Sequence, residues 1–241
     1  EISACLVGSE MCIRDSLFHG LSPYSGISKK ILHQVKGFEA CGHRVSLCTY
    51  SIADNGHRVR MINNEIIEDY GTGKPAAAKR RVSYQCIYRY AITHQVELIY
   101  VRSFHNANPF TIRLFSKLRK AGIKIAMEIP TYPYDSEYAG FPLVTRLGIQ
   151  VDKVFRKTLA KHVNAIVTFS DYHCIFGQRT IQISNGVDFD SIPLKKTVSK
   201  NTSVIHLLGV AEVHYWHGYD RLIEGLGKYC LLYTSDAADE A

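Results

Sequence analysis

The sequence predicts an α/β protein in which helices cover both faces of a parallel sheet. From Leu17 onward, short apolar segments alternate with longer segments whose apolar residues recur at helical spacing. The short segments are nearly continuous apolar runs, as expected for strands that are buried on both faces. With 241 residues, 46% hydrophobic and 21% charged, the chain has the composition of a soluble globular protein, which excludes collagen, coiled coil and bulk disorder. No apolar run approaches the roughly 18 residues of a transmembrane helix.

The two ends of the chain resemble translated sequencing adapters. Leu6–Ser16 (LVGSEMCIRDS) matches one reading frame of a transposase adapter, and Cys230–Glu240 (CLLYTSDAADE) matches its partner. We therefore expect residues 1–16 and 230–241 to be non-native and the chain to be an internal fragment. The alternative is a natural polar N-terminal arm and an acidic C-terminal tail. Without residues 1–15 and 230–241, 28 basic and 16 acidic side chains remain, a net charge of +12 instead of +7. The four remaining cysteines form no CxxC pair, which favours reduced thiols in a cytoplasmic protein.

The first part of the native segment predicts a strand, a helix, a second strand and a hairpin. Leu17–His19 is expected to be the stub of the first strand. A helix is predicted over Ile27–Cys41, with Gly42 as its stop, and its apolar face would consist of Ile27, Ile31, Leu32, Val35 and Phe38. A strand is indicated at Val45–Thr49, and Arg58–Ile67 could form a hairpin that turns at Asn63-Asn64.

The alternation of strands and helices continues through the second part. The predicted elements are a basic helix at Lys79–Gln95, a strand at Glu97–Arg102, a helix from Asn108-Pro109 to Gly122, a strand at Ile123–Ile129, a helix at Leu143–Lys161, and strands at Asn164–Phe169 and Thr180–Ile183. The long helix is expected to bury Leu147, Val151, Phe155 and Leu159. A polar linker at 189–202 would separate this first domain, 17–188, from a second at 203–229, which begins with a strand at Ser203–Gly209.

Ligands of parallel sheets bind at the carboxyl ends of the strands, and this rule selects the candidate site residues. Ser25-Gly26 precedes a helix, where free N–H groups could bind an anion or a sugar hydroxyl, or could simply form a tight turn. Arg102 and His105 follow a strand end and could bind an anionic or hydroxylated ligand or form a salt bridge. Glu128 lies inside an apolar strand, so we expect it either to reach the cleft, which we favour, or to pair with Arg102.

A loop rich in proline and tyrosine follows this strand. Pro130–Glu137 contains Tyr132 and Asp135, whose ring and carboxylate would suit a sugar; the alternative is a purely structural loop. No GxGxxG sequence is present, and Gly71–Lys74 lacks the spacing of a phosphate-binding loop. His214 and His217 have no third ligand nearby in the sequence, so no metal site is predicted.

Four motifs occur along the chain in the order found in one enzyme family. In chain order they are Ser25–Val45, Glu128–Asp135, Ile183–Asp188 (ISNGVD) between two predicted strands, and His217–Leu226 at the start of a helix. Together they resemble family 4 glycosyltransferases, and Glu128–Asp135 resembles a subset that acts in bacterial surface-polysaccharide synthesis. The resemblance covers nearly all of 17–229.

The resemblance implies a GT-B fold, in which two Rossmann-like lobes face a cleft. The chain would comprise the N-terminal, acceptor-binding lobe and the first strand and helix of the lobe that binds a nucleotide-sugar donor. The implied reaction is transfer of a sugar, with retained anomeric configuration, to a glycan acceptor that we expect to be lipid-linked, with no metal and no cofactor. The candidate acceptor-binding residues are Ser25, Gly26, Arg102, His105, Glu128, Tyr132 and Asp135, and the candidate donor-binding residues are Gly209, His217 and Gly218.

The donor region departs from the family pattern. Ala211 and His217 lie near the positions where the family has arginine and lysine, and the family's paired glutamates would lie beyond Tyr229. We therefore assign no catalytic residue and expect this chain to be inactive, whereas the full-length parent would be a glycosyltransferase.

The basic residues gather on predicted helices, at Lys29-Lys30, Lys79–Arg81, Arg113–Lys120 and Arg156–Lys161. They fit either solvated helix faces or peripheral attachment to the inner face of an anionic membrane, which would suit a lipid-linked acceptor. A sugar-nucleotide epimerase shares the two-lobe fold and is the nearest alternative enzyme. A nucleic-acid-binding module also fits the charge, but the sequence has no matching motif, and we expect no nucleic-acid partner.

Overall fold

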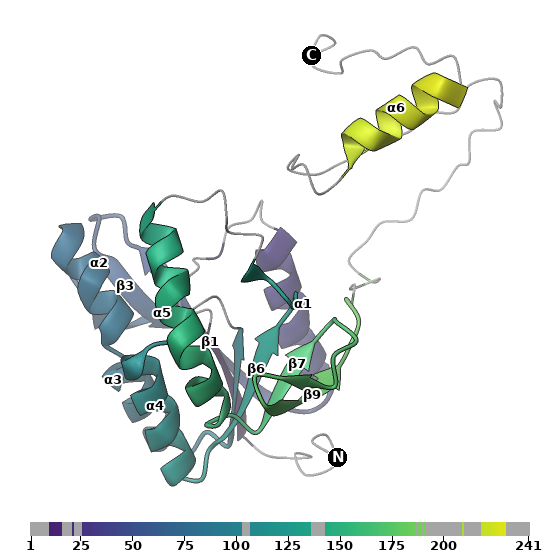
Figure 1. Cartoon of the computed structure of the whole chain (residues 1–241). Helices are drawn as coiled ribbons and strands as arrows, with labels where there is room; N and C mark the ends of the chain where they lie inside the picture. Colours follow the sequence, from purple (N-terminus) through teal and green to yellow (C-terminus); the bar gives the residue numbers. More distant parts are fainter. Residues whose placement is uncertain are drawn as a thin grey trace. The chain divides into compact units, whose positions relative to one another are not determined.

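The computed structural model describes residues 10–15, 21, 26–102, 107–135, 143–186, 188, 190, 209 and 218–229. The chain divides into two compact units between Ile192 and Pro193, within the predicted linker. The elements in chain order are β1 (Glu10–Asp15), α1 (Gly26–Ala40), β2 (Arg44–Ile52), β3 (Arg58–Ile62), β4 (Glu65–Asp69), α2 (Gly73–Val82), α3 (Gln85–Thr93), β5 (Leu98–Arg102), α4 (Pro109–Lys120), β6 (Lys124–Ile129), α5 (Leu143–Ala160), β7 (Ala165–Thr168), β8 (Cys174–Ile175), β9 (Gln178–Gln182) and α6 (Tyr219–Tyr229). All except α6 belong to the first unit, which is mixed α/β (Figure 1).

The strands of the first unit form a sheet in the order β4-β3-β2-β1-β5-β6-β7-β9-β8. The six central strands, β2-β1-β5-β6-β7-β9, pair in parallel with their neighbours. At the edges, β3, β4 and β8 add antiparallel pairs. The predicted α/β class with a parallel sheet is therefore confirmed. Because β2 and β5 lie on opposite sides of β1, the strand order reverses between β1 and β5. Such a reversal leaves a crevice at the carboxyl ends of the strands, where α/β proteins bind ligands.

The first strand differs from the prediction. β1 consists of Glu10–Asp15, within the segment that resembles an adapter, and the predicted stub Leu17–His19 lies outside the described residues. Ile13 pairs with Ser46 of β2 and with Ile99 of β5. Parallel pairing uses backbone N–H and C=O groups, which every residue except proline carries in full. A segment can therefore fill this position without a matching side-chain pattern.

The two faces of the sheet carry separate apolar cores, because successive side chains of a strand point to opposite faces. Leu98 and Tyr100 of β5 pack in a cluster with Val35 and Phe38 of α1. The residues between and after them, Ile99 and Val101, join a larger core with residues of α3, α4 and α5. Of the described helices, α1 thus covers one face and α3, α4 and α5 cover the other (Figure 1).

The predicted hairpin is confirmed. β3 and β4 pair antiparallel, and Asn63 and Asn64 at the turn have φ of +48° and +71°. Asparagine tolerates this left-handed region better than most residues, and two such residues in sequence form the turn that matches strand twist. The Asn63 side chain also accepts a hydrogen bond from the backbone N–H of Leu47 (2.8 Å), which ties the turn to β2.

The prediction of a single basic helix over Lys79–Gln95 is wrong. α2 ends at Val82 and α3 begins at Gln85, and buried Tyr84 lies between them. The two helices pack on different surfaces: α2 buries Ala76 and Arg80, whereas α3 buries Cys86, Ile87 and Ala91 in the larger core. Arg80 is 8% exposed, and its guanidinium lies 3.9 Å from the ring centre of Tyr50, so this residue is not on a solvated face.

The predicted ends of α1 and α4 are confirmed. Asn108 caps α4 by accepting hydrogen bonds from Phe110 and Thr111, and Pro109 is the first helical residue. Gly42 and Gly122, which follow α1 and α4, both have φ of +84°.

The predicted apolar faces of α1 and α5 are only partly correct. Ile31 is buried, but Ile27 and Leu32 on α1 are each 43% exposed. On α5, Leu159 is buried, but Leu147 and Val151 are exposed, and Ile149 is buried instead. The core therefore meets each helix on a narrower strip than the apolar pattern suggests.

The second unit contains α6, close to the predicted helix start. Its leading apolar residues, Leu222 and Ile223, are more than half exposed. Of the predicted strand Ser203–Gly209, only Gly209 lies within the described residues.

Candidate functional site

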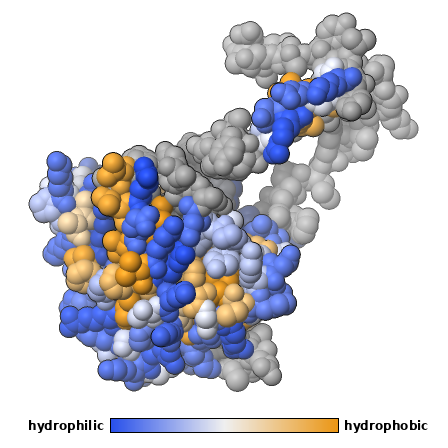
Figure 2. Space-filling view, viewed as in Figure 1, coloured by the Kyte–Doolittle hydropathy of each residue, from blue (hydrophilic) through white to orange (hydrophobic). Residues whose placement is uncertain are grey.

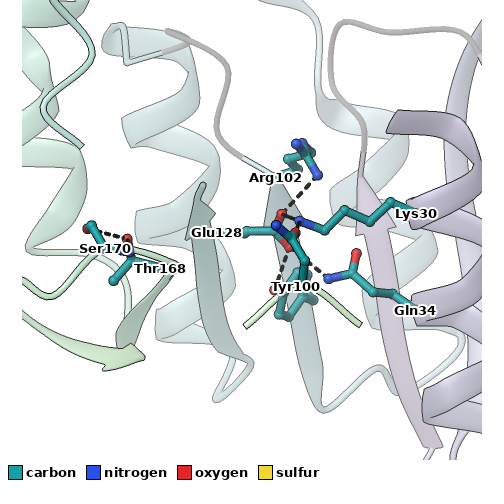
Figure 3. A network of polar contacts seen from close by, with 8 residues as sticks. Lys30, Gln34, Tyr100, Arg102, Glu128, Thr168 and Ser170 are labelled. Atoms are coloured by element: carbon teal, nitrogen blue, oxygen red, sulfur yellow. Dashed lines mark hydrogen bonds and ion pairs between the residues drawn. The ribbon is translucent and has the colours of Figure 1, made fainter. Parts of the chain in front are cut away.

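A buried carboxylate lies at the centre of the site. Glu128 is on β6, and its side chain is 0% exposed. Arg102 is its direct register partner on β5, and Tyr100 lies two residues earlier on the same face of β5. Since this is the α1 face, Glu128 also meets two side chains of α1, Lys30 and Gln34 (Figure 3).

Each carboxylate oxygen of Glu128 meets two of these groups. Oε1 accepts a hydrogen bond from Nη1 of Arg102 (2.9 Å) and lies 3.8 Å from Nζ of Lys30. Oε2 accepts from the hydroxyl of Tyr100 (2.6 Å) and from Nε2 of Gln34 (3.1 Å). A buried carboxylate is stable only when it is paired and hydrogen-bonded, and these contacts meet both conditions. Among the described residues, two cations, Lys30 and Arg102, face one anion, so this part of the cluster carries a local surplus of positive charge.

Lys30 links this cluster to the carboxyl ends of two further strands. Its Nζ donates a hydrogen bond to Oδ1 of Asn185 (2.7 Å), which follows β9, and lies 3.5 Å from the ring centre of Phe169, which follows β7. Lys36, closer to the C-terminal end of α1, forms an ion pair with Asp188 (Nζ to Oδ2, 3.4 Å). The ISNGVD segment is thus held against α1 at both its asparagine and its aspartate. Of the two alternatives for the basic residues, a solvated helix face does not describe Lys30, whose side chain is only 19% exposed.

A groove runs along α1 beside this cluster. It has a volume of about 480 Å³ and lies between α1 and the ISNGVD segment, with Lys30, His33, Gln34, Ser184 and Gly186 in its lining. Within the described residues, the buried Oε1 of Gln34 has no hydrogen-bond partner. The amide nitrogen of Gln34 already donates to Glu128, so the free atom is an acceptor. Gln34 lines the groove, but this oxygen itself is buried from solvent.

The structure brings together two of the predicted acceptor residues, Arg102 and Glu128. Their pairing is the alternative that we did not favour: the carboxylate is buried against its counter-charges rather than open to the cleft. Gly26 is the first residue of α1, and an added Cβ there would meet no atom within 4 Å. Ser25 and His105 lie outside the described residues.

The other two predicted acceptor residues, Tyr132 and Asp135, contact a different region. The ring of Tyr132 meets those of Tyr172 (5.0 Å between centres) and Phe176 (5.4 Å), each in an edge-on arrangement. Asp135 accepts two hydrogen bonds from Arg156 of α5, at 2.7 and 3.1 Å. These hydrogen bonds, together with the charge of Arg156, lower the pKa of Asp135.

A buried acid lies behind this loop. Asp152 of α5 is 2% exposed and accepts hydrogen bonds from the backbone N–H of Ala107 (3.0 Å) and the hydroxyl of Tyr134 (3.1 Å). Burial raises the pKa of Asp152, and burial likewise raises the pKa of Tyr134. The loop after β6 is therefore attached to α5 by a polar contact in the core and an ion pair at the surface.

Sequence reasoning missed Lys30, Gln34 and Tyr100 as members of the site. One signal was present: Lys30 and Gln34 are four residues apart at the start of the first helix, so they share a face. The alternation of β5 also places Tyr100 and Arg102 on one face. What the sequence does not reveal is that α1 lies opposite β6.

The donor residues that the structure describes lie in the second unit. An added Cβ on Gly209 would lie 2.8 Å from Cε1 of Tyr219, and one on Gly218 would lie 2.8 Å from Nη2 of Arg221. Gly218, with φ of +66°, directly precedes α6. His217 lies outside the described residues.

The comparisons with known proteins give no family for this chain: no family model, no curated protein and no solved structure matches it. Within the described ranges, no three His, Cys, Asp or Glu side chains are grouped to hold a metal ion. No helix in the same ranges is long and apolar enough to cross a membrane. Cys41, Cys48, Cys86 and Cys174 are free thiols.

Proposed function

We propose that residues 17–229 derive from a retaining, family 4 glycosyltransferase of the GT-B type, and that the first unit is its acceptor-binding lobe. The observation that carries the proposal is the position of Asn185. The asparagine of the ISNGVD motif meets Lys30 beside the Arg102–Glu128 pair, at the carboxyl edge of the sheet. This is the edge at which α/β proteins bind ligands.

The chemistry of the cluster suits an anionic, hydroxylated acceptor. Lys30 and Arg102 are 19% and 12% exposed, so both cations can be reached from solvent, whereas Glu128 is 0% exposed. Glu128 thus acts as a positioning residue that holds the two cations and Gln34 in place. Gln34 lines the groove, where its amide could meet a sugar hydroxyl, and the two described cations, Lys30 and Arg102, favour a phosphate group. A glycan linked through phosphate to a lipid combines these two features.

The donor would be a nucleotide sugar bound by the second lobe. Transfer breaks the bond between the sugar's anomeric carbon and the donor diphosphate. It forms a bond from that carbon to the oxygen of an acceptor hydroxyl, whose proton leaves with the diphosphate. The departing diphosphate needs positive charge close by. Arg221, beside Gly218 at the start of α6, brings one cation to a helix N-terminus in this unit.

The first test is to sequence the source locus outward from 17–229 with long reads. A reading frame that continues past Tyr229 into a second βαβ lobe with paired glutamates would support the proposal. The extended protein should then transfer labelled sugar from a nucleotide sugar to lipid-linked glycans, and the chain of 241 residues should not. A locus in which residues 1–16 and 230–241 are genuine coding sequence, or sugar transfer by the 241-residue chain, would contradict it.

A site-specific test uses the extended protein. Arg102→Gln should lower transfer about tenfold or more, because a charged hydrogen-bond donor at the acceptor is lost. Arg113→Gln, an exposed position on α4, is the matched control and should leave transfer unchanged. An epimerase would instead convert the nucleotide sugar in the absence of any acceptor, which product analysis distinguishes.

A further inference from the structure

α5 has an exposed apolar stripe in addition to the strip that it buries. Leu143, Leu147, Val151 and Val154 are 69%, 59%, 45% and 71% exposed. Their spacing of four, four and three residues places them on one side of the helix. Figure 2 shows orange residues gathered over α5, on the face turned to the viewer. The helix does not need this stripe for the core, because Ile149, Phe155 and Leu159 contact the rest of the unit.

A row of cations lies beside the stripe. Arg146 and Lys157 are exposed, whereas Lys153 is half-buried and forms an ion pair with Asp135 (3.6 Å). Helical geometry places all three along one edge of the stripe. The acid of this helix, Asp152, points into the core instead. Every exposed charge that the structure describes on α5 is therefore positive.

We propose that α5 binds the surface of an anionic phospholipid bilayer, with the stripe inserted at the headgroup boundary and the cations at lipid phosphates. Aliphatic residues flanked by lysine and arginine are the pattern of helices that lie in a membrane interface. A protein partner is less well matched, because the stripe has no tryptophan, tyrosine or arginine anchor of the kind that dominates protein interfaces. Such binding would bring the proposed enzyme to a lipid-linked acceptor, which lies in the same bilayer, and in this respect the inference rests on the proposed function.

The test measures co-sedimentation of the full chain with vesicles. Vesicles of equal parts phosphatidylglycerol and phosphatidylcholine should bind the chain, and vesicles of phosphatidylcholine alone should bind it at least about tenfold more weakly. Leu147→Asp should reduce binding to the anionic vesicles about tenfold or more. The control is Ile66→Asp on β4, where the side chain has almost the same exposure, 57% against 59%, and binding should not change.

A second pair of variants separates α5 from the other basic helices. Removing two cations of α5 in Arg146→Gln/Lys157→Gln should weaken binding to the anionic vesicles about tenfold or more, whereas Lys79→Gln/Arg81→Gln on α2 should not. All four substituted positions are exposed, so circular dichroism should show an unchanged fold and melting temperature. Equal losses in both double variants would overturn the assignment to α5.

Two other results would also overturn the inference. One is a chain that binds neither kind of vesicle. The other is a concentration-dependent dimer that Leu147→Asp disrupts, with no vesicle binding, because the stripe would then be an interface between two copies. None of these readouts involves sugar transfer, so vesicle binding can fail or succeed independently of the proposed glycosyltransferase activity.

Discussion

Replacing Glu128 by glutamine tests whether the buried cluster holds the sheet and α1 together. The substitution keeps the shape of the side chain but removes its charge. In the native protein both oxygens accept hydrogen bonds, Oε1 from Arg102 and Oε2 from Tyr100 and Gln34. Whichever way the new amide turns, its NH₂ group must face at least one donor. Arg102 and Lys30 would also lose the counter-charge that they share within the cluster.

The magnitude follows from burial. Removing one partner of a buried ion pair costs about 3–5 kcal/mol, because the remaining charge is left desolvated. Arg102 and Lys30 are 12% and 19% exposed, so partial solvation places the expected loss near the lower limit, about 3 kcal/mol. A typical domain is stable by about 5–15 kcal/mol, so Glu128→Gln should still fold. Tyr100→Phe removes one hydrogen bond to the carboxylate (2.6 Å) and should cost about 1.5–3 kcal/mol.

Urea unfolding of the full chain, followed by fluorescence, measures these losses. The matched control is Asp135→Asn, which removes an ion pair with Arg156. The carboxylate of Asp135 is 35% exposed, so this substitution should lower the unfolding free energy by about 1 kcal/mol or less. The denaturant slope should be the same in all variants, so that midpoint shifts report stability. If Glu128→Gln costs no more than Asp135→Asn, the buried cluster does not hold α1 to the sheet.

Two further predictions concern the core acid and the hairpin. For Asp152, burial raises the folded-state pKa above its ordinary 3.8, so the proton-bound form favours folding and stability is lost as pH rises through the folded pKa. Urea melts at several pH values should therefore show that Asp152→Asn gains stability relative to the unsubstituted chain as the pH rises above 3.8. A difference in unfolding free energy that does not change with pH would refute this role of burial. At the hairpin, Asn64 has φ of +71°, so Asn64→Gly should be neutral or stabilise by up to about 1 kcal/mol and Asn64→Val should destabilise by about 1–2 kcal/mol. Equal melting temperatures for the two variants would show that the turn is not left-handed.

Local signals predicted much of the fold. The Asn63-Asn64 turn, the cap at Asn108-Pro109 and the glycine stops at Gly42 and Gly122 all depend on residues within a few positions of one another. Each is a steric or hydrogen-bonding preference of the local backbone, so it can be predicted without knowledge of the remaining chain. The alternation of strands and helices likewise predicts a parallel sheet, because only buried strands are apolar on both faces.

Predictions failed where a distant contact decides the outcome. The break between α2 and α3 depends on the burial of Tyr84 and on Arg80 packing over Tyr50, which lies on another element. The exposed side of α5 depends on how narrow a strip of the helix meets the core. Hydrophobic periodicity indicates which residues share a face, but not whether another element covers that face.

By itself, the sequence determined the α/β class, the hairpin, the helix ends, and Arg102 and Glu128 as candidate site residues on neighbouring strands. Only the tertiary structure decided what Glu128 does. It is a buried anion that pairs with Arg102 and contacts Lys30, Gln34 and Tyr100, rather than a carboxylate open to a cleft. The physical reason is that the state of a carboxylate depends on the charges and solvent around it. Those surroundings came from α1, whose Gln34 lies 94 residues earlier in the chain and whose Lys30 also donates a hydrogen bond to Asn185 after β9.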